Sequence, residues 1–213
     1  MQNFCVHLVD FEGFGKSKEP KQAKTVADYA NDVINLICEK DMKDLIIIGH
    51  SFGGRVAIEI ASRYPNLVKK LVLVDSAGLK PHRKPSYFIK IWLYKIKKTL
   101  NLDISKCGSS DYKVLSPIMQ KTFYNVVNYY QDSLLKAINA KTLIIFGKND
   151  RETPIYMAKK LNKNIKNSKL ILFDNCGHFP FLEDTYNFIR VVENFIDEWV
   201  CILYNLSTIV KLF

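Results

Sequence analysis

One serine of this sequence has the surroundings of a nucleophile. Residues 49–53 read Gly-His-Ser-Phe-Gly, the pattern G-x-S-x-G, and they lie between an apolar run and a segment with helical spacing. A sharp turn from strand to helix would lift the hydroxyl of Ser51 above a sheet. The backbone N–H of Phe52, at the start of the helix, would then face a developing oxyanion. The pattern therefore predicts acyl transfer at Ser51, and the alternative is a Gly-rich turn without catalysis.

A serine hydroxyl becomes a strong nucleophile only when a base removes its proton. His178 follows the apolar run at residues 170–173 and comes after Ser51 in the chain. Histidine titrates near neutral pH, so it can accept the proton and return it to a leaving group. Because open α/β sheets place their sites at the carboxyl ends of strands, we predict that His178 is the base.

Two aspartates compete for the acid that would hold the imidazole and stabilise its cation. Asp150 follows the apolar run at residues 143–146, and Asp75 follows the run at residues 71–74. The chain order Ser, Asp, His is expected with this type of serine turn, which favours Asp150. Asp75 remains the alternative, and Asp174 is expected to close a turn.

Strands and helices that could position these side chains alternate along most of the chain. Continuous apolar runs are typical of strands buried on both faces of a parallel sheet, and they occur at residues 4–10, 45–48, 71–74, 143–146 and 170–173. Helical spacing occurs at residues 25–40, 52–64 and 183–199 and begins again near Pro154. Thr25 is the expected cap of the first helix. The alternation predicts an α/β fold with a mostly parallel sheet.

Residues 79–138 interrupt the alternation, because they contain helical patterns and prolines but no buried-strand run. We predict a helical cap inserted into a core made of residues 1–78 and 139–200. Residues 201–213 form an unmatched C-terminal tail. Within the cap, residues 86–101 are basic and strongly apolar; we expect them to pack on their own domain rather than on a lipid surface. Other apolar side chains expected near a substrate are those of Trp92, Met119 and Phe123.

The composition is that of an ordinary globular protein with an excess of basic residues, 31 Lys+Arg against 21 Asp+Glu. The lysines are scattered, so we expect no nucleic-acid partner and no membrane contact. Asp10 and Glu12 break the first apolar stretch, which argues against a signal peptide. An odd number of cysteines without metal-site spacing indicates reduced thiols and a cytoplasmic protein; they are Cys5, Cys38, Cys107, Cys176 and Cys201. The sequence makes no prediction of oligomeric state.

Together these motifs resemble the α/β-hydrolase superfamily, in its esterase-like branch with a helical cap. Residues 10–17 are similar to the D-x-x-G-x-G-x-S loop of the family, and residues 177–183 match the segment around its histidine. The resemblance covers roughly residues 4–198. It implies Ser51, Asp150 and His178 as a catalytic triad, a small-molecule acyl substrate, and no metal or organic cofactor. It also implies that Asp10 and residues 13–17 form a loop rather than take part in catalysis.

The N-terminus departs from the family pattern, which has three strands before the one that resembles residues 4–10. The loop after the third strand carries a His-Gly motif with the second oxyanion donor. We therefore expect an N-terminally truncated sheet with a gap between strands 4–10 and 45–48, and low activity. One missing donor typically costs about 10²–10³ in turnover. Two repairs are conceivable: strand 4–10 could move across, or residues 201–213 could fill the gap. We expect neither, since the crossovers are set for the original spacing.

The sequence is compatible with three functions. The first is hydrolysis of a carboxylic ester or similar acyl bond through an acyl-enzyme on Ser51. The second is carbon–carbon bond hydrolysis of a diketone-like substrate with the same triad. The third is a non-catalytic hydrolase-fold fragment, which the missing oxyanion loop favours and the triad opposes.

Overall fold

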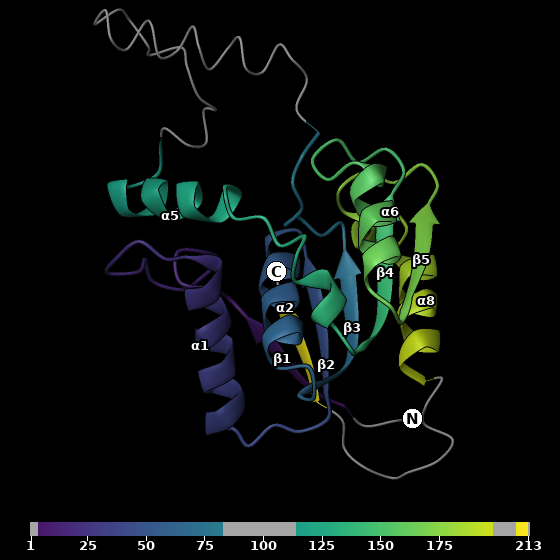
Figure 1. The fold of residues 1–213 in the computed structure, drawn as a ribbon, viewed down its shortest axis with the longest axis horizontal. Helices are drawn as coiled ribbons and strands as arrows, with labels where there is room; N and C mark the ends of the chain where they lie inside the picture. The colour runs from purple at the N-terminus through teal and green to yellow at the C-terminus, as the bar shows by residue number, and fades with distance from the viewer. Residues whose placement is uncertain (1–3, 83–113, 198–207, 213) are drawn as a thin grey trace, which may run out of the picture.

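A six-stranded parallel sheet forms the centre of the computed structural model, which describes residues 4–82, 114–197 and 208–212 (Figure 1). The strand order is β1-β6-β2-β3-β4-β5, and each recorded pair is parallel. The strands are β1 (Cys5–Val9), β2 (Leu45–His50), β3 (Val68–Val74), β4 (Lys141–Gly147), β5 (Ser168–Phe173) and β6 (Thr208–Leu212). The predicted α/β fold with a mostly parallel sheet is confirmed.

Helices cover both faces of the sheet. One face carries α1 (Val26–Glu39), α2 (Phe52–Arg63), the 3₁₀ turn η1 (Leu135–Ala137) and α6 (Ile155–Asn164). The other face carries α8 (Thr185–Asp197), which follows the short helix α7 (Pro180–Glu183). The helix predicted at 183–199 corresponds to α8, and the short helix α7 before it was not predicted.

The continuous apolar runs of the central strands are explained by two cores, one on each face. Ile47, Leu71 and Ile144 point into the core beneath α1, α2 and α6. Their neighbours Ile48 and Val72 point into the core beneath α8. Because successive side chains of a strand alternate between faces, a strand covered on both sides has to be apolar throughout.

The first helix begins where its cap predicts. The hydroxyl of Thr25 accepts the N–H of Asp28, and the carboxylate of Asp28 accepts the N–H of Thr25. This reciprocal capping box satisfies two backbone donors that the helix itself cannot pair. It fixes the start of α1 and hence the path of the loop that precedes it.

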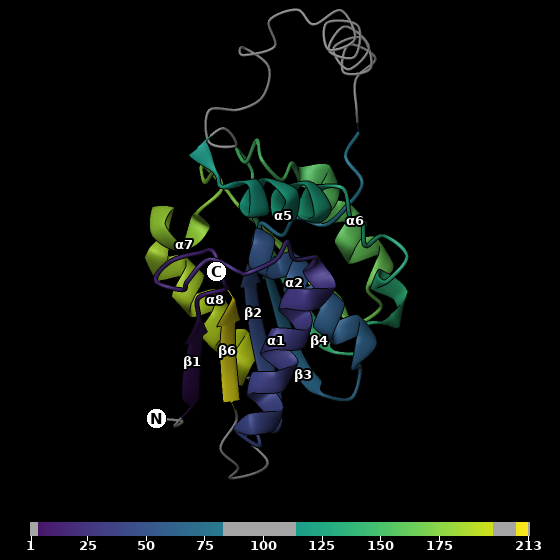
Figure 2. The ribbon, with the colours of Figure 1, turned by 90° about the vertical axis from the view of Figure 1, so that its left-hand side faces the viewer.

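The C-terminal strand corrects the prediction that the gap in the sheet would stay open. β6 lies between β1 and β2 and pairs with both, with Val210 opposite His7 on one side and Ile47 on the other (Figure 2). The expectation that residues 201–213 would not fill this position was wrong. β1, on the outer side of β6, is an edge strand of the sheet.

The position of α8 explains why the tail can reach this place. Lys70, in the first half of β3, donates from Nζ to the carbonyls of Phe195 and Ile196 at 3.0 and 2.6 Å. The last turn of α8 is therefore held at the edge of the sheet where parallel strands begin. From there only residues 198–207 separate it from β6, two strand positions away from β3, and at about 3.3 Å per residue that length is ample. The strand of the tail, β6, thus takes the single position between β1 and β2.

Within the segment predicted as a cap, helix α5 (Pro117–Val127) lies across the edge where the strands end (Figures 1 and 2). The turn η1 belongs to the same segment but packs into the core on one face of the sheet, so it is not part of a cap. The loop before α1 anchors α5, since Thr122 Oγ1 accepts the N–H of Lys24 and Asn125 donates to the Lys24 carbonyl. Met119 packs against Gly13 of that loop, whereas Phe123 is exposed. Residues 86–101, with Trp92, lie outside the described residues.

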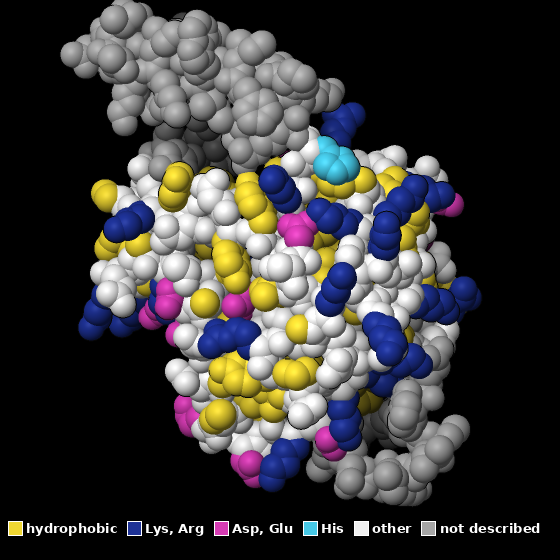
Figure 3. All heavy atoms as spheres, viewed as in Figure 1, with side chains coloured by type: hydrophobic (Ala, Val, Ile, Leu, Met, Phe, Trp, Pro, Cys, Tyr) yellow, Lys and Arg dark blue, Asp and Glu magenta, His cyan; other side chains and the backbone are white. Residues whose placement is uncertain are grey.

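The sequence predicts neither a nucleic-acid partner nor membrane contact, because its lysines are scattered. Lys and Arg side chains are spread over the face seen in Figure 3, with acidic side chains between them in places. Within the described ranges, the helices are all too short or too polar to cross a membrane. Cys5, Cys38 and Cys176 are free thiols.

Candidate active site

Ser51 stands at a strained turn between β2 and α2. Its φ of 48° and ψ of −106° fall in a region that residues other than glycine rarely adopt. A Cβ on Gly49 would lie 2.6 Å from the carbonyl oxygen of Gly53, so only glycine permits this close approach. The N–H of Ser51 donates to the Val74 carbonyl of β3 at 3.0 Å, which ties the turn to the sheet. The predicted nucleophile elbow has this geometry.

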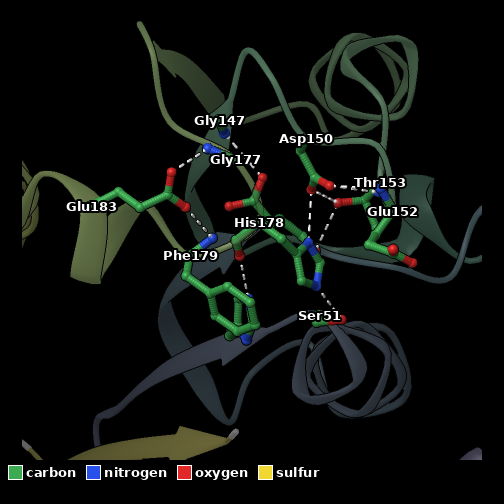
Figure 4. A network of polar contacts seen from close by, with 11 residues as sticks. Ser51, Gly147, Asp150, Glu152, Thr153, Gly177, His178, Phe179 and Glu183 are labelled. Atoms are coloured by element: carbon green, nitrogen blue, oxygen red, sulfur yellow. Dashed lines mark hydrogen bonds and ion pairs between the residues drawn. The ribbon is translucent and has the colours of Figure 1, made fainter. Parts of the chain in front are cut away.

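His178 connects Ser51 to Asp150 (Figure 4). Its Nδ1 lies 2.8 Å from Asp150 Oδ2, and its Nε2 lies 2.9 Å from Ser51 Oγ. A carboxylate oxygen can only accept, so Nδ1 carries the hydrogen and Nε2 is left to accept the hydroxyl of Ser51. The contact predicted between Asp150 and His178 is thus present, in the tautomer that a general base requires.

Asp150 is held as an anion. Burial by itself would raise its pKa, but hydrogen bonds from His178, Thr153 and Glu152 outweigh burial and lower the pKa below its ordinary value. The N–H groups of Glu152 and Thr153 both donate to Oδ1, at 2.7 and 3.1 Å, and the Thr153 hydroxyl donates to Oδ2. The carboxylate is therefore fixed in direction as well as in charge.

Two side chains that the sequence analysis did not single out hold the segment around His178. Glu183 accepts the N–H of Gly177 at 2.7 Å and of Phe179 at 3.0 Å (Figure 4). His50 Nε2 donates to the carbonyl of His178 at 2.8 Å. Burial lowers the pKa of His50, so its neutral form is favoured. Both residues lie inside the quoted motifs, at 49–53 and 177–183, and that position was the available signal.

Asp75 does not occupy the position of the acid. It directly follows β3, and its Oδ1 accepts the N–H of Gly147 at 3.0 Å. Asp174 is exposed and pairs with Lys148. Of the three candidate carboxylates, only that of Asp150 has a recorded hydrogen bond to His178. Asp10 accepts the N–H of Lys16 at 3.0 Å and closes the loop that the resemblance implied.

Phe52 is the first residue of α2, so its N–H has no carbonyl partner within the helix. The N-terminus of α2 directs this N–H and the positive end of the helix dipole toward the region above Ser51. A second oxyanion donor is unassigned among the described residues. Reduced turnover for lack of it therefore stays a prediction.

Asp75, Asp150 and His178 are the one group in the described ranges with the residue types and spacing of a metal site. The hydrogen bond between Asp150 and His178 occupies atoms that would have to bind the ion. We therefore describe the group as part of the triad's surroundings and assign no cofactor to it.

Comparison with known proteins agrees with the fold. The sequence profile of the α/β-hydrolase fold family matches residues 2–125 and 110–185. The chain belongs to the α/β-hydrolase fold family.

Two relatives with named activities are hydrolases. The chain is 27% identical to a 2-hydroxymuconate semialdehyde hydrolase of Pseudomonas putida, over 89% of this chain and 75% of that protein. It is 28% identical to a pimeloyl-[acyl-carrier protein] methyl ester esterase of Nitrosomonas europaea, over 88% of this chain and 83% of that protein. A solved meta-cleavage product hydrolase of Pseudomonas fluorescens superposes with a TM-score of 0.66 at 24% identity, over 89% of this chain and 78% of that one. The solved structure supports the fold alone.

Proposed function

We propose that this chain is a serine hydrolase that cleaves a carboxylic ester or a similar acyl bond of a small molecule. The observation that carries the proposal is the line of hydrogen bonds from Ser51 through His178 to Asp150. Each link has the length of a good hydrogen bond, and the nucleophile stands on a strained turn at the head of a helix. Nucleophile, base and acid thus meet the geometric requirements of a triad.

The reaction follows from the protonation states. His178 Nε2 takes the proton of Ser51 Oγ as the oxygen attacks the acyl carbon, and the resulting imidazolium is stabilised by the Asp150 anion. The N–H of Phe52 stabilises the oxyanion of the tetrahedral intermediate. His178 then gives its proton to the leaving alcohol, and an acyl-enzyme on Ser51 remains. Water, deprotonated by His178, attacks this ester and releases the acid and free Ser51.

A second candidate is hydrolysis of a carbon–carbon bond beside a ketone. It is favoured by the similarity to the 2-hydroxymuconate semialdehyde hydrolase, which is comparable in identity to the similarity to the esterase. The same three residues would serve both reactions. Substrate choice would rest on the cap, of which α5 lies at the edge where the strands end.

The test combines a covalent probe with two substrate classes. A fluorophosphonate should label the folded chain on Ser51, and p-nitrophenyl esters should be hydrolysed. Faster turnover of a vinylogous diketone than of the esters would favour the second candidate. Neither labelling nor turnover by a cooperatively folded chain would indicate a non-catalytic hydrolase-fold protein.

Replacing Asp150 with asparagine should lower kcat by on the order of 10⁴. Asparagine can offer its amide nitrogen to His178 and favour the wrong tautomer, and it cannot stabilise the imidazolium. The matched control is Asp174→Asn, which removes an exposed carboxylate paired only with Lys148. Steady-state ester turnover at pH 7 measures both variants. Similar rates for the two would contradict the role of Asp150.

A further inference from the structure

The Asp75 carboxyl is fully buried yet only half satisfied. The residue is 0% exposed and has a φ of 39°, and its Oδ1 accepts the Gly147 N–H. Its second oxygen, Oδ2, is buried and has no hydrogen-bond partner among the residues that the structure describes. A buried carboxylate oxygen without a donor is costly, and this cost disappears if the oxygen carries a proton and donates it.

An acceptor for such a proton is close at hand. Ligand atoms of Asp75, Asp150 and His178 all lie within 4.8 Å of one another. Two neighbouring buried carboxyl groups resist being ionised together, so one keeps a proton. Asp150 receives hydrogen bonds from His178, Glu152 and Thr153, whereas Asp75 receives the single bond from Gly147. Asp150 is therefore the anion that is better stabilised by hydrogen bonds, and the shared proton resides on Asp75.

We propose that Asp75 is a positioning residue, a neutral carboxylic acid whose Oδ2–H donates to the Asp150 carboxylate and holds it toward His178. The inference rests on the proposed function, because it assigns Asp75 a part in keeping that triad aligned. Asp75 thus supports Asp150 from the adjacent strand end, without touching a substrate.

The charge around Asp75 favours the neutral form. The pKa of Asp75 is raised to about 8, chiefly by burial and further by the carboxylates of Asp150 and Glu183, although the Gly147 N–H lowers it. Other titratable groups that face this region are His178 and Cys176 from the segment after β5, and burial raises the pKa of the Cys176 thiol. At pH 7 Asp75 is then protonated, and above about pH 8 it becomes a second anion beside Asp150.

Kinetics of two substitutions test the positioning role. Asp75→Asn keeps the shape and a donor, so at pH 7 kcat should stay within about threefold of the parent. Asp75→Ala removes the donor and should lower kcat by about 10–100-fold, the range typical of outer hydrogen-bond partners, with KM unchanged. The parent should lose kcat as pH rises through about 8, and Asp75→Asn should not. Two results would overturn the inference. One is a loss of kcat in Asp75→Asn as large as that in Asp150→Asn. The other is the same dependence of kcat on pH above 7 in the parent and in Asp75→Asn.

The pH dependence of unfolding detects the proton on Asp75 and does not rely on catalytic activity. The folded-state pKa of Asp75 is raised above the ordinary value of 3.8, so between about pH 4 and pH 8 the folded chain keeps a proton that the unfolded chain releases. The parent must therefore lose stability relative to Asp75→Asn as pH rises through this window. The ratio of their unfolding constants should change by up to about tenfold per pH unit, and level off above about pH 8.

The two proposals fail separately. A constant stability difference from pH 4 to pH 8 would mean that Asp75 is ionised in the folded chain and would overturn the inference, whatever the turnover. A folded chain that is neither labelled nor active but shows the pH-dependent difference would contradict the proposed hydrolysis and support the protonated state of Asp75.

Discussion

Ser51→Ala is expected to abolish labelling by a fluorophosphonate and to lower ester turnover by on the order of 10⁶-fold. The hydroxyl oxygen is the atom that bonds to the acyl group, and it is the one nucleophile that contacts the His178 ring within the described parts of the chain. His178→Ala should cost a similar factor, because members of a triad act as a unit and their losses do not add. Mass spectrometry of the intact protein reports labelling, and initial rates report turnover.

Ser62→Ala is the matched control for this prediction. Ser62 lies near the end of α2, the helix that Ser51 precedes. Its hydroxyl donates to the Glu59 carbonyl at 3.0 Å, away from the triad. The control should label and turn over as the parent does. Full labelling of Ser51→Ala would show that the nucleophile lies elsewhere and would remove the proposed function.

Removing residues 201–213 is expected to destabilise the fold by at least about 4 kcal/mol, the range of the most damaging changes. Without β6, the inner edges of β1 and β2 lose their recorded partners, and backbone N–H and C=O groups along both are left unpaired. Because domains are stable by only about 5–15 kcal/mol, cooperative unfolding should be weakened or lost. Thermal unfolding followed by circular dichroism measures the effect.

A point substitution separates backbone pairing from side-chain packing. Val210 stands in the middle of β6, with partners on both sides. Val210→Pro removes an N–H from a strand that is paired along both edges, so its effect should approach that of the deletion. Val210→Ala keeps the N–H and serves as the control. A deletion that leaves the midpoint of unfolding unchanged would show that the sheet does not depend on β6.

The triad was predictable because its members are tied to local patterns. Ser51 and Asp150 follow buried strands and His178 follows the partly buried strand β5, and the carboxyl ends of parallel strands meet along one edge. Spacing alone, however, leaves two acids, since Asp75 and Asp150 follow the adjacent strands β3 and β4. The loop beyond β4 decides between them. It carries Asp150 three residues past Gly147, where its carboxylate meets His178, whereas Asp75 follows β3 directly and accepts the N–H of Gly147 instead.

The sequence by itself determined the α/β alternation, the capped start of α1 and the serine turn, because each depends on residues a few positions apart. Tertiary structure alone decided which strand lies between β1 and β2. Residues 208–212 read Thr-Ile-Val-Lys-Leu, a pattern that suits a strand in any sheet. Their pairing with residues 5–9, at the other end of the chain, leaves no local signal. It depends on where α8 ends and on unpaired backbone groups that only the assembled sheet presents.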